Sequence, residues 1–120
     1  MSARAKVERR GRRGQPSVSG SRLLIRLRPA DFDRYTAIAK SRGLHLAQWM
    51  RQACYLAARG QLDMRAASGA PPPSEQLTRR TQIPLRPSEM AAWERLAHEV
   101  GLTLSAWMRQ AAYLAASQGE

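Results

Sequence analysis

One helical segment is written twice in this chain, and the repeat restricts the folds that the chain can adopt. The segment "WMRQACYLAARG" spans residues 49–60, and "WMRQAAYLAASQ" spans residues 107–118, at an offset of 58. At this offset the two stretches stay in register without a gap from Arg22 and Arg80 to Ala58 and Ala116. A match of this length is not a chance event, so the chain carries two copies of one structural unit.

Each copy opens with a stretch in which the side chains alternate. The face expected to point inward holds Leu23, Ile25 and Leu27 in the first copy, and Thr81, Ile83 and Leu85 in the second. The face expected to point outward holds Arg22, Leu24 and Arg26, and in the second copy Arg80, Gln82 and Pro84. A period of two residues predicts short strands over 22–28 and 80–86.

The pattern then changes to a helical period of 3.6 residues. Pro29 and Pro87 are well placed at the first position of a helix, and Gly43 and Gly101 are suited to ending one. We therefore predict helices over 29–42, 46–59, 87–100 and 104–117. Thr103 is a good N-cap for the last of these, whereas His45 is a mediocre one at the matching place. The second helix of each copy should bury Trp49, Met50, Ala53 and Ala57, or Trp107, Met108, Ala111 and Ala115.

A single strand–helix–helix unit is too small to be stable alone, because its strand has no partner and its helices bury little surface. Two units solve the problem if their strands pair antiparallel and their four helices pack beneath. The predicted fold is therefore mainly α-helical with a two-stranded antiparallel β-ribbon. The predicted organisation is a disordered basic arm at 1–20, copy one at 21–60, a flexible linker at 61–79 and copy two at 80–118.

The net charge of +11 implies an acidic partner, of which nucleic acid is the commonest, with an anionic membrane surface second. The single cysteine, Cys54, excludes an internal disulfide and a cysteine metal cluster; Ala112 stands at the matching position, so we expect Cys54 to pack as a small apolar side chain. We expect no cofactor, no metal site and no enzyme activity, because no catalytic constellation or glycine-rich phosphate loop is present. With neither a signal peptide nor an apolar membrane span, a soluble cytoplasmic protein is expected.

The repeated unit resembles the ribbon-helix-helix (Arc/MetJ-type) DNA-binding family. The resemblance lies in the alternating strand, the first helix, the turns Gly43-Leu44-His45 and Gly101-Leu102-Thr103, and the second helix of each copy, about two-thirds of the chain in all. Most members of that family are homodimers. A single chain with two units, a monomeric pseudo-dimer, resembles a smaller group that includes plasmid conjugative-transfer accessory proteins; further association on DNA stays open.

The resemblance implies a β-ribbon inserted in the major groove of double-stranded DNA. Carried over by position, Arg22, Leu24, Arg26, Arg80, Gln82 and Pro84 would face bases, although Pro84 departs from the family pattern because it has no donor. The family also binds phosphates at the N-terminus of the second helix, which implies His45, Leu46 and Ala47, and Thr103, Leu104 and Ser105. For His45 a plain surface cap is an equally good interpretation. Arg28 and Arg86 could reach the DNA backbone as well. Arg51 and Arg109 repeat in both copies and are interpreted as the solvated outer face of a helix.

The basic arm contains Arg4, Lys6, Arg9, Arg10, Arg12 and Arg13. These side chains could lie along phosphates or in a minor groove, or the arm could be a solubilising tail.

Three functions remain open at the level of sequence. The first is a transcriptional regulator that binds an operator. The second is a relaxosome accessory protein that binds an origin of transfer in conjugation, together with other DNA-processing proteins. The third is an adaptor that uses the helices to bind protein. An antitoxin is disfavoured, because family antitoxins usually carry a C-terminal toxin-binding segment and little chain follows copy two.

Overall fold

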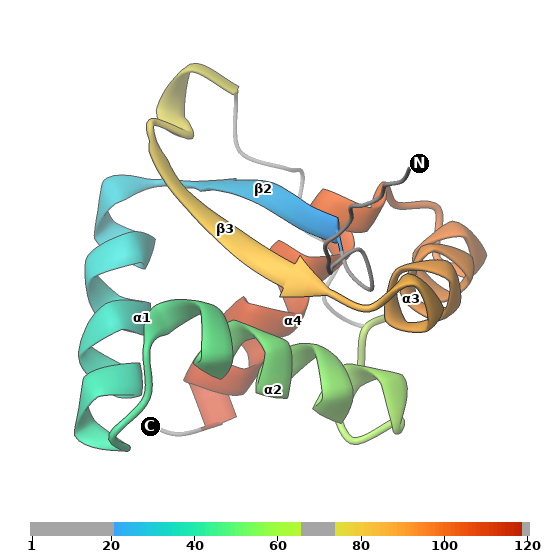
Figure 1. Ribbon diagram of the computed structural model, residues 1–120, viewed down its shortest axis with the longest axis horizontal. Coiled ribbons are helices and arrows are strands. Elements are labelled where there is room, and N and C mark those ends of the chain that lie inside the picture. Colours follow the sequence, from blue (N-terminus) through green and yellow to red (C-terminus); the bar gives the residue numbers. More distant parts are fainter. Residues whose placement is uncertain (1–20, 66–73, 119–120) are drawn as a thin grey trace, which may run out of the picture.

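The computed structural model describes residues 21–65 and 74–118, and in this part of the chain four helices pack against a two-stranded sheet (Figure 1). The strands are β2 (Ser21–Leu27) and β3 (Arg79–Leu85). The helices are α1 (Pro29–Ser41), α2 (Leu46–Ala58), α3 (Pro87–Glu99) and α4 (Leu104–Gln118), and a short 3₁₀ turn, η2 (Ser74–Gln76), precedes β3. The prediction of a mainly helical fold with a two-stranded antiparallel sheet is confirmed.

The helices begin and end where proline and glycine predict. Pro29 and Pro87 occupy the first positions of α1 and α3. Gly43 and Gly101 follow these helices with φ angles of 72° and 75°, a backbone conformation that glycine adopts without strain. The turn is closed each time by the same hydrogen bond: the Leu44 N–H donates to the Ala39 carbonyl, and the Leu102 N–H to the Ala97 carbonyl, both at 2.9 Å.

The register of the sheet relates the two copies to each other. Leu24 lies opposite Gln82, and these are also the residues that the 58-residue offset aligns. On either side of this pair, Arg22 lies opposite Pro84 and Arg26 opposite Arg80. The 58-residue offset aligns Arg22 with Arg80 and Arg26 with Pro84. Each of the two flanking pairs therefore consists of the residues that align with the members of the other pair.

The core lies between the inner face of the sheet and the four helices. Figure 1 shows the strands on one side of the molecule, with α2 and α4 crossing on the other side and α1 and α3 at the two ends. The predicted inward residues Ile25, Leu27, Ile83 and Leu85 are buried, and so are the Trp-Met pairs at 49–50 and 107–108. The prediction for Ala115 is wrong: Ala115 is half-buried, and Ala112 and Ala116 take the buried side of α4 instead.

Aromatic side chains join the helices within and between the copies. Tyr35 packs against Trp49 with ring centroids 5.3 Å apart, and the matching pair Trp93 and Trp107 is 6.0 Å apart. Tyr55 of α2 meets Trp93 of α3 edge-to-face at 5.2 Å, a contact between the copies. Cys54 is buried and so is Ala112, as the small-apolar interpretation of Cys54 predicts.

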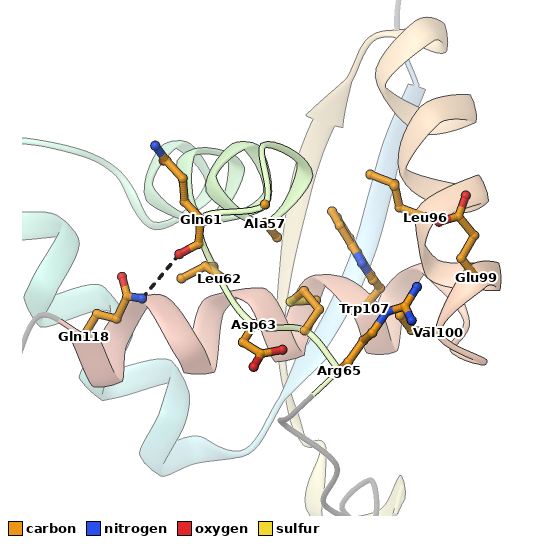
Figure 2. Close-up of a pocket in the computed structure, with 12 residues that line it drawn as sticks. Ala57, Gln61, Leu62, Asp63, Arg65, Leu96, Glu99, Val100, Trp107 and Gln118 are labelled. Carbon is orange, nitrogen blue, oxygen red and sulfur yellow. Dashed lines mark hydrogen bonds between the residues drawn. The ribbon is translucent and has the colours of Figure 1, made fainter.

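The segment after α2 folds back onto the core. Leu62 and Met64 retain only 4% and 9% of their exposure, although both lie in the stretch 61–79 that we predict as a linker. The Gln110 side chain donates to the Met64 carbonyl at 2.6 Å. The Gln118 side chain donates to the Gln61 carbonyl at 3.4 Å (Figure 2). The start of this stretch is thus fixed to α4, while residues 66–73 lie outside the described part of the chain.

Candidate nucleic-acid interface

The outer face of the sheet is a continuous exposed surface. All six side chains predicted to face outward are exposed. They are Arg22, Leu24 and Arg26 of β2 with Arg80, Gln82 and Pro84 of β3. Leu24 is 39% exposed, one of two large apolar side chains in the described residues that are exposed in this way. Pro84 does not end β3, which continues to Leu85. The surface therefore combines cations, an amide and apolar groups on one two-stranded element.

The two ends of this surface differ in charge. At one end Arg26 lies directly opposite Arg80, and like charges in a cross-strand pair destabilise a sheet. Arg79 adds a third cation at the same end, held over the Phe32 ring at 4.2 Å and 4.0 Å from the Asp33 carboxylate. At the other end Arg22 lies opposite Pro84, which has no charge. We call the end of the ribbon formed by Arg26, Arg79 and Arg80 the basic end.

The N-termini of α2 and α4 are capped in different ways. The Thr103 hydroxyl accepts the Ala106 N–H at 3.2 Å, as expected for a threonine N-cap. At the matching place the His45 N–H donates to the Gln48 side-chain oxygen at 2.8 Å. His45 and Thr103 are exposed, and the residues that follow them in each first turn, Leu46, Ala47, Leu104 and Ser105, are half-buried. The first N–H groups of a helix lack intrahelical acceptors, so both termini have donors suited to an anion.

Arg28 and Arg86, the residues just before α1 and α3, are exposed but differently engaged. The Arg28 Nε donates to Asp31 Oδ2 at 2.8 Å, and this hydrogen bond raises the pKa of the Arg28 guanidinium. The Arg86 backbone N–H donates to Glu89 Oε1 at 2.8 Å, which leaves its exposed side chain out of that bond. Because the Arg28 guanidinium is bonded to Asp31, the Arg86 guanidinium is the more available of the two for an external anion.

The interpretation of Arg51 and Arg109 as solvated helix surface is wrong. Arg51 Nη2 lies 2.5 Å from Glu89 Oε2, and the Tyr55 hydroxyl donates to the same oxygen, with Glu89 only 7% exposed. Arg109 is half-buried on α4, where its Nη1 lies 3.5 Å from the Arg26 carbonyl oxygen. Burial lowers the pKa of the Arg109 guanidinium. From the sequence, Glu89 can be expected in the first turn of α3, three residues after Arg86, where its carboxylate can accept the Arg86 N–H. No local pattern shows that Arg51 is its second partner.

A pocket of about 520 Å³ lies where the segment after α2 meets α3 and α4 (Figure 2). Its charged lining consists of Asp63, Arg65 and Glu99, so it offers one cation with two carboxylates and is unsuited to a phosphate. Within residues 21–65 and 74–118, no three His, Cys, Asp or Glu side chains are grouped so as to hold a metal ion. No helix in the same residues has the length and apolarity needed to cross a membrane.

Searches against protein-family models, curated proteins and solved structures gave no match to this chain. The exposed face of the ribbon, the N-termini of α2 and α4, and Arg28 and Arg86 are therefore the features that bear on function. The basic arm with Arg4, Lys6, Arg9, Arg10, Arg12 and Arg13 lies outside the described residues.

Proposed function

We propose that this protein is a sequence-specific double-stranded DNA-binding protein that inserts its β-ribbon into the major groove and acts as a transcriptional regulator in the cytoplasm. The observation that carries the proposal is the outer face of the ribbon, where three side chains from each strand are exposed, while the opposite face buries Ile25, Leu27, Ile83 and Leu85. A two-stranded ribbon has the dimensions to enter a major groove. The helices then serve to hold this ribbon in one shape.

We propose further that the chain is a pseudo-dimer of two ribbon-helix-helix units. Support comes from the register, in which the aligned residues Leu24 and Gln82 lie opposite each other at the centre of the ribbon. A homodimer of one unit would place a residue opposite its own copy at the same point, as two-fold symmetry requires. The matching pairs Tyr35–Trp49 and Trp93–Trp107 support the same relation in the core.

The side chains on the ribbon have the chemistry for reading bases. Arginine can bond the O6 and N7 of guanine together, glutamine can pair with adenine in the same way, and leucine can contact a thymine methyl group. The opposed cations Arg26 and Arg80 carry a repulsion that a nearby polyanion would relieve. The ribbon is thus better suited to a DNA groove than to open solvent.

Selection of bound duplexes from a random DNA pool tests this function, followed by affinity measurements on the enriched sequence and on unrelated DNA. Arg26→Ala should weaken binding to the enriched site by about 1–3 kcal/mol, roughly 5-fold to 150-fold, and should weaken binding to unrelated DNA much less. Arg95→Ala, which removes an exposed arginine from α3, is the matched control and should leave the preference intact. Failure to enrich any sequence, or equal losses on both DNAs, would refute base reading by Arg26.

A reporter gene placed behind the enriched site tests the regulatory role. A regulator must occupy its operator in competition with a large excess of other sites, so base-specific discrimination is the property that matters. Expression should change when the protein is supplied, and Arg26→Ala should remove the change. Binding without any effect on the reporter would support a structural role on DNA instead.

A further inference from the structure

The second helices of the two copies carry the same Arg-Tyr pair, four residues apart, but only one pair holds a carboxylate. On α2 the pair is Arg51 and Tyr55, and both bond Glu89 Oε2. Glu89 comes from the first turn of α3 in the other copy and is almost completely buried. The pair on α2 is therefore an anion-binding arrangement whose anion is built into the chain.

On α4 the matching pair is Arg109 and Tyr113, and the residue that matches Glu89 is Asp31. Asp31 has a side chain one methylene shorter than that of Glu89, and its carboxylate is bonded to Arg28 at 2.8 Å. Among the described residues, Arg109 has no carboxylate within 4 Å. Its Nη1 donates a long hydrogen bond, 3.5 Å, to the Arg26 carbonyl oxygen. Tyr113 is 49% exposed, whereas Tyr55 is half-buried against Trp93.

We propose that Arg109 and Tyr113 form a binding site for a phosphate group, the external counterpart of the Glu89 carboxylate. For DNA as the source of that phosphate, the inference rests on the proposed function. The Arg109 contact with the Arg26 carbonyl places the site next to the basic end of the ribbon. Arg28 directly follows β2 at that end of the ribbon and lies close enough to Tyr113 for the two groups to interact electrostatically.

Three physical arguments favour an external anion here. The same two side-chain types bond a carboxylate on α2, so Arg and Tyr four residues apart can act together as donors to an oxyanion. Arg109 is half-buried, and burial lowers the pKa of its guanidinium, while the one hydrogen bond described for it is the long one to the Arg26 carbonyl, so its lost hydration is only partly replaced. The chain has a net charge of +11, which favours a phosphate over an uncharged ligand and draws polyanions to it.

Thermal unfolding of the full chain in sodium phosphate and in sodium chloride, at equal ionic strength, tests the site without DNA. At a phosphate concentration about ten times the Kd, the wild-type midpoint should rise by about 5 °C relative to chloride. Arg109→Gln should lose this rise, and the charge-matched control Arg95→Gln should keep it. Equal rises in all three proteins would place the bound phosphate elsewhere and overturn the proposal.

Asp31→Glu gives a second variant that does not depend on deleting a charge. It places in α1 the same residue type that the matching position 89 holds in α3. The longer side chain, still in the first turn of α1, should let the carboxylate reach Arg109 and Tyr113. The midpoint in chloride should rise, and phosphate should add nothing further. If Asp31→Glu responds to phosphate as fully as the wild type does, the site does not exist.

DNA affinity measured at several salt concentrations then shows whether the phosphate bound by Arg109 and Tyr113 belongs to DNA. Asp31→Glu should weaken binding to all duplexes and reduce the slope of log affinity against log salt by about one phosphate contact, whereas Arg95→Gln should not. A phosphate response without any DNA binding would support the site and refute the proposed function. Normal DNA binding with an unchanged slope and no phosphate response would refute the site alone. A larger midpoint shift with a poly-glutamate peptide than with phosphate would assign the site to an acidic protein segment and overturn the phosphate assignment.

Discussion

At the scale of single residues, Glu89 and its counterpart Asp31 differ in burial and in hydrogen-bond partners. The Glu89 carboxylate accepts hydrogen bonds from the Arg86 backbone, Arg51 and Tyr55, and it is nearly inaccessible to water. Asp31, at the matching place, forms an ion pair with Arg28 whose side chains are 19% and 44% exposed. A buried charge that loses its partner costs far more than an exposed one, because water cannot replace the lost contacts.

We therefore expect Glu89→Gln to lower the free energy of unfolding by about 1.5–3 kcal/mol, since it weakens the charge-assisted hydrogen bonds of the half-buried Arg51 and of Tyr55. Asp31→Asn is the matched control and should cost about 0–1 kcal/mol, the usual worth of an exposed ion pair. Urea unfolding of both variants measures the difference. Similar losses at the two positions would mean that the Glu89 contacts contribute no more than a surface pair.

Cys54 gives a pH-dependent prediction. Burial raises the pKa of its thiol in the folded protein, whereas an unfolded thiol has a pKa of about 8.5. The stabilisation from this group is fully present below the unfolded value and is lost as the pH rises towards the folded value. Wild type should therefore lose stability relative to Cys54→Ala between about pH 8.5 and 10, as measured by urea unfolding. A constant difference across this range would contradict a buried, protonated thiol.

At the scale of elements, the two faces of the ribbon differ in burial. Ile25 on the inner face is fully buried, and Leu24 beside it points outward. Ile25→Ala should cost about 2–5 kcal/mol in unfolding free energy, because a large buried side chain leaves a cavity. Leu24→Ala should leave unfolding nearly unchanged and weaken binding to the selected DNA. Urea unfolding and DNA titration of both variants test this division, and a large stability loss in Leu24→Ala would contradict it.

The elements themselves could be predicted from local chemistry. Each predicted strand and helix boundary lies within one residue of the observed one, because Pro29, Pro87, Gly43 and Gly101 constrain the backbone wherever they occur. The outward face of the ribbon was predictable for a similar reason, since a strand turns alternate side chains to opposite sides. These signals are local, so a single sequence contains them.

Contacts between distant residues could not be predicted in this way. The ion pair of Arg51 with Glu89 joins positions 38 apart in the chain, and neither neighbourhood shows a pattern that names the other. Leu62 and Met64 lie in a stretch without periodicity, so their burial depends on α4 being beside them. The sequence shows that Asp31 is shorter than Glu89, but it does not show that Asp31 pairs with Arg28 while Glu89 pairs with Arg51.

At the scale of the whole molecule, the two copies are held together by the ribbon and by the packing of α2 against α4. A protease site introduced within residues 66–73 allows the chain to be cut between the two copies while the contacts among residues 21–65 and 74–118 are kept. Before cleavage the unfolding midpoint should be independent of concentration. After cleavage each tenfold dilution should cost about 1.4 kcal/mol, because the halves must then find each other. A midpoint that already depends on dilution in the intact chain would show that ribbons form between molecules.

The recognition site should be an imperfect inverted repeat, and the register indicates where the symmetry fails. A homodimer presents the same residues to both half-sites and reads a palindrome. Here one end of the ribbon presents Arg26 with Arg80, and the other presents Arg22 with Pro84, which can donate no hydrogen bond. Single-base substitutions should therefore cost about 1–3 kcal/mol at bases facing the basic end, and less at the mirror-related bases. The second helices of the two copies are nearly identical, whereas the exposed face of the ribbon differs at two of its three matched positions. Base-by-base substitution of the selected site, read out as DNA affinity, tests this asymmetry, and equal penalties at mirror-related positions would show that the chain still reads a palindrome.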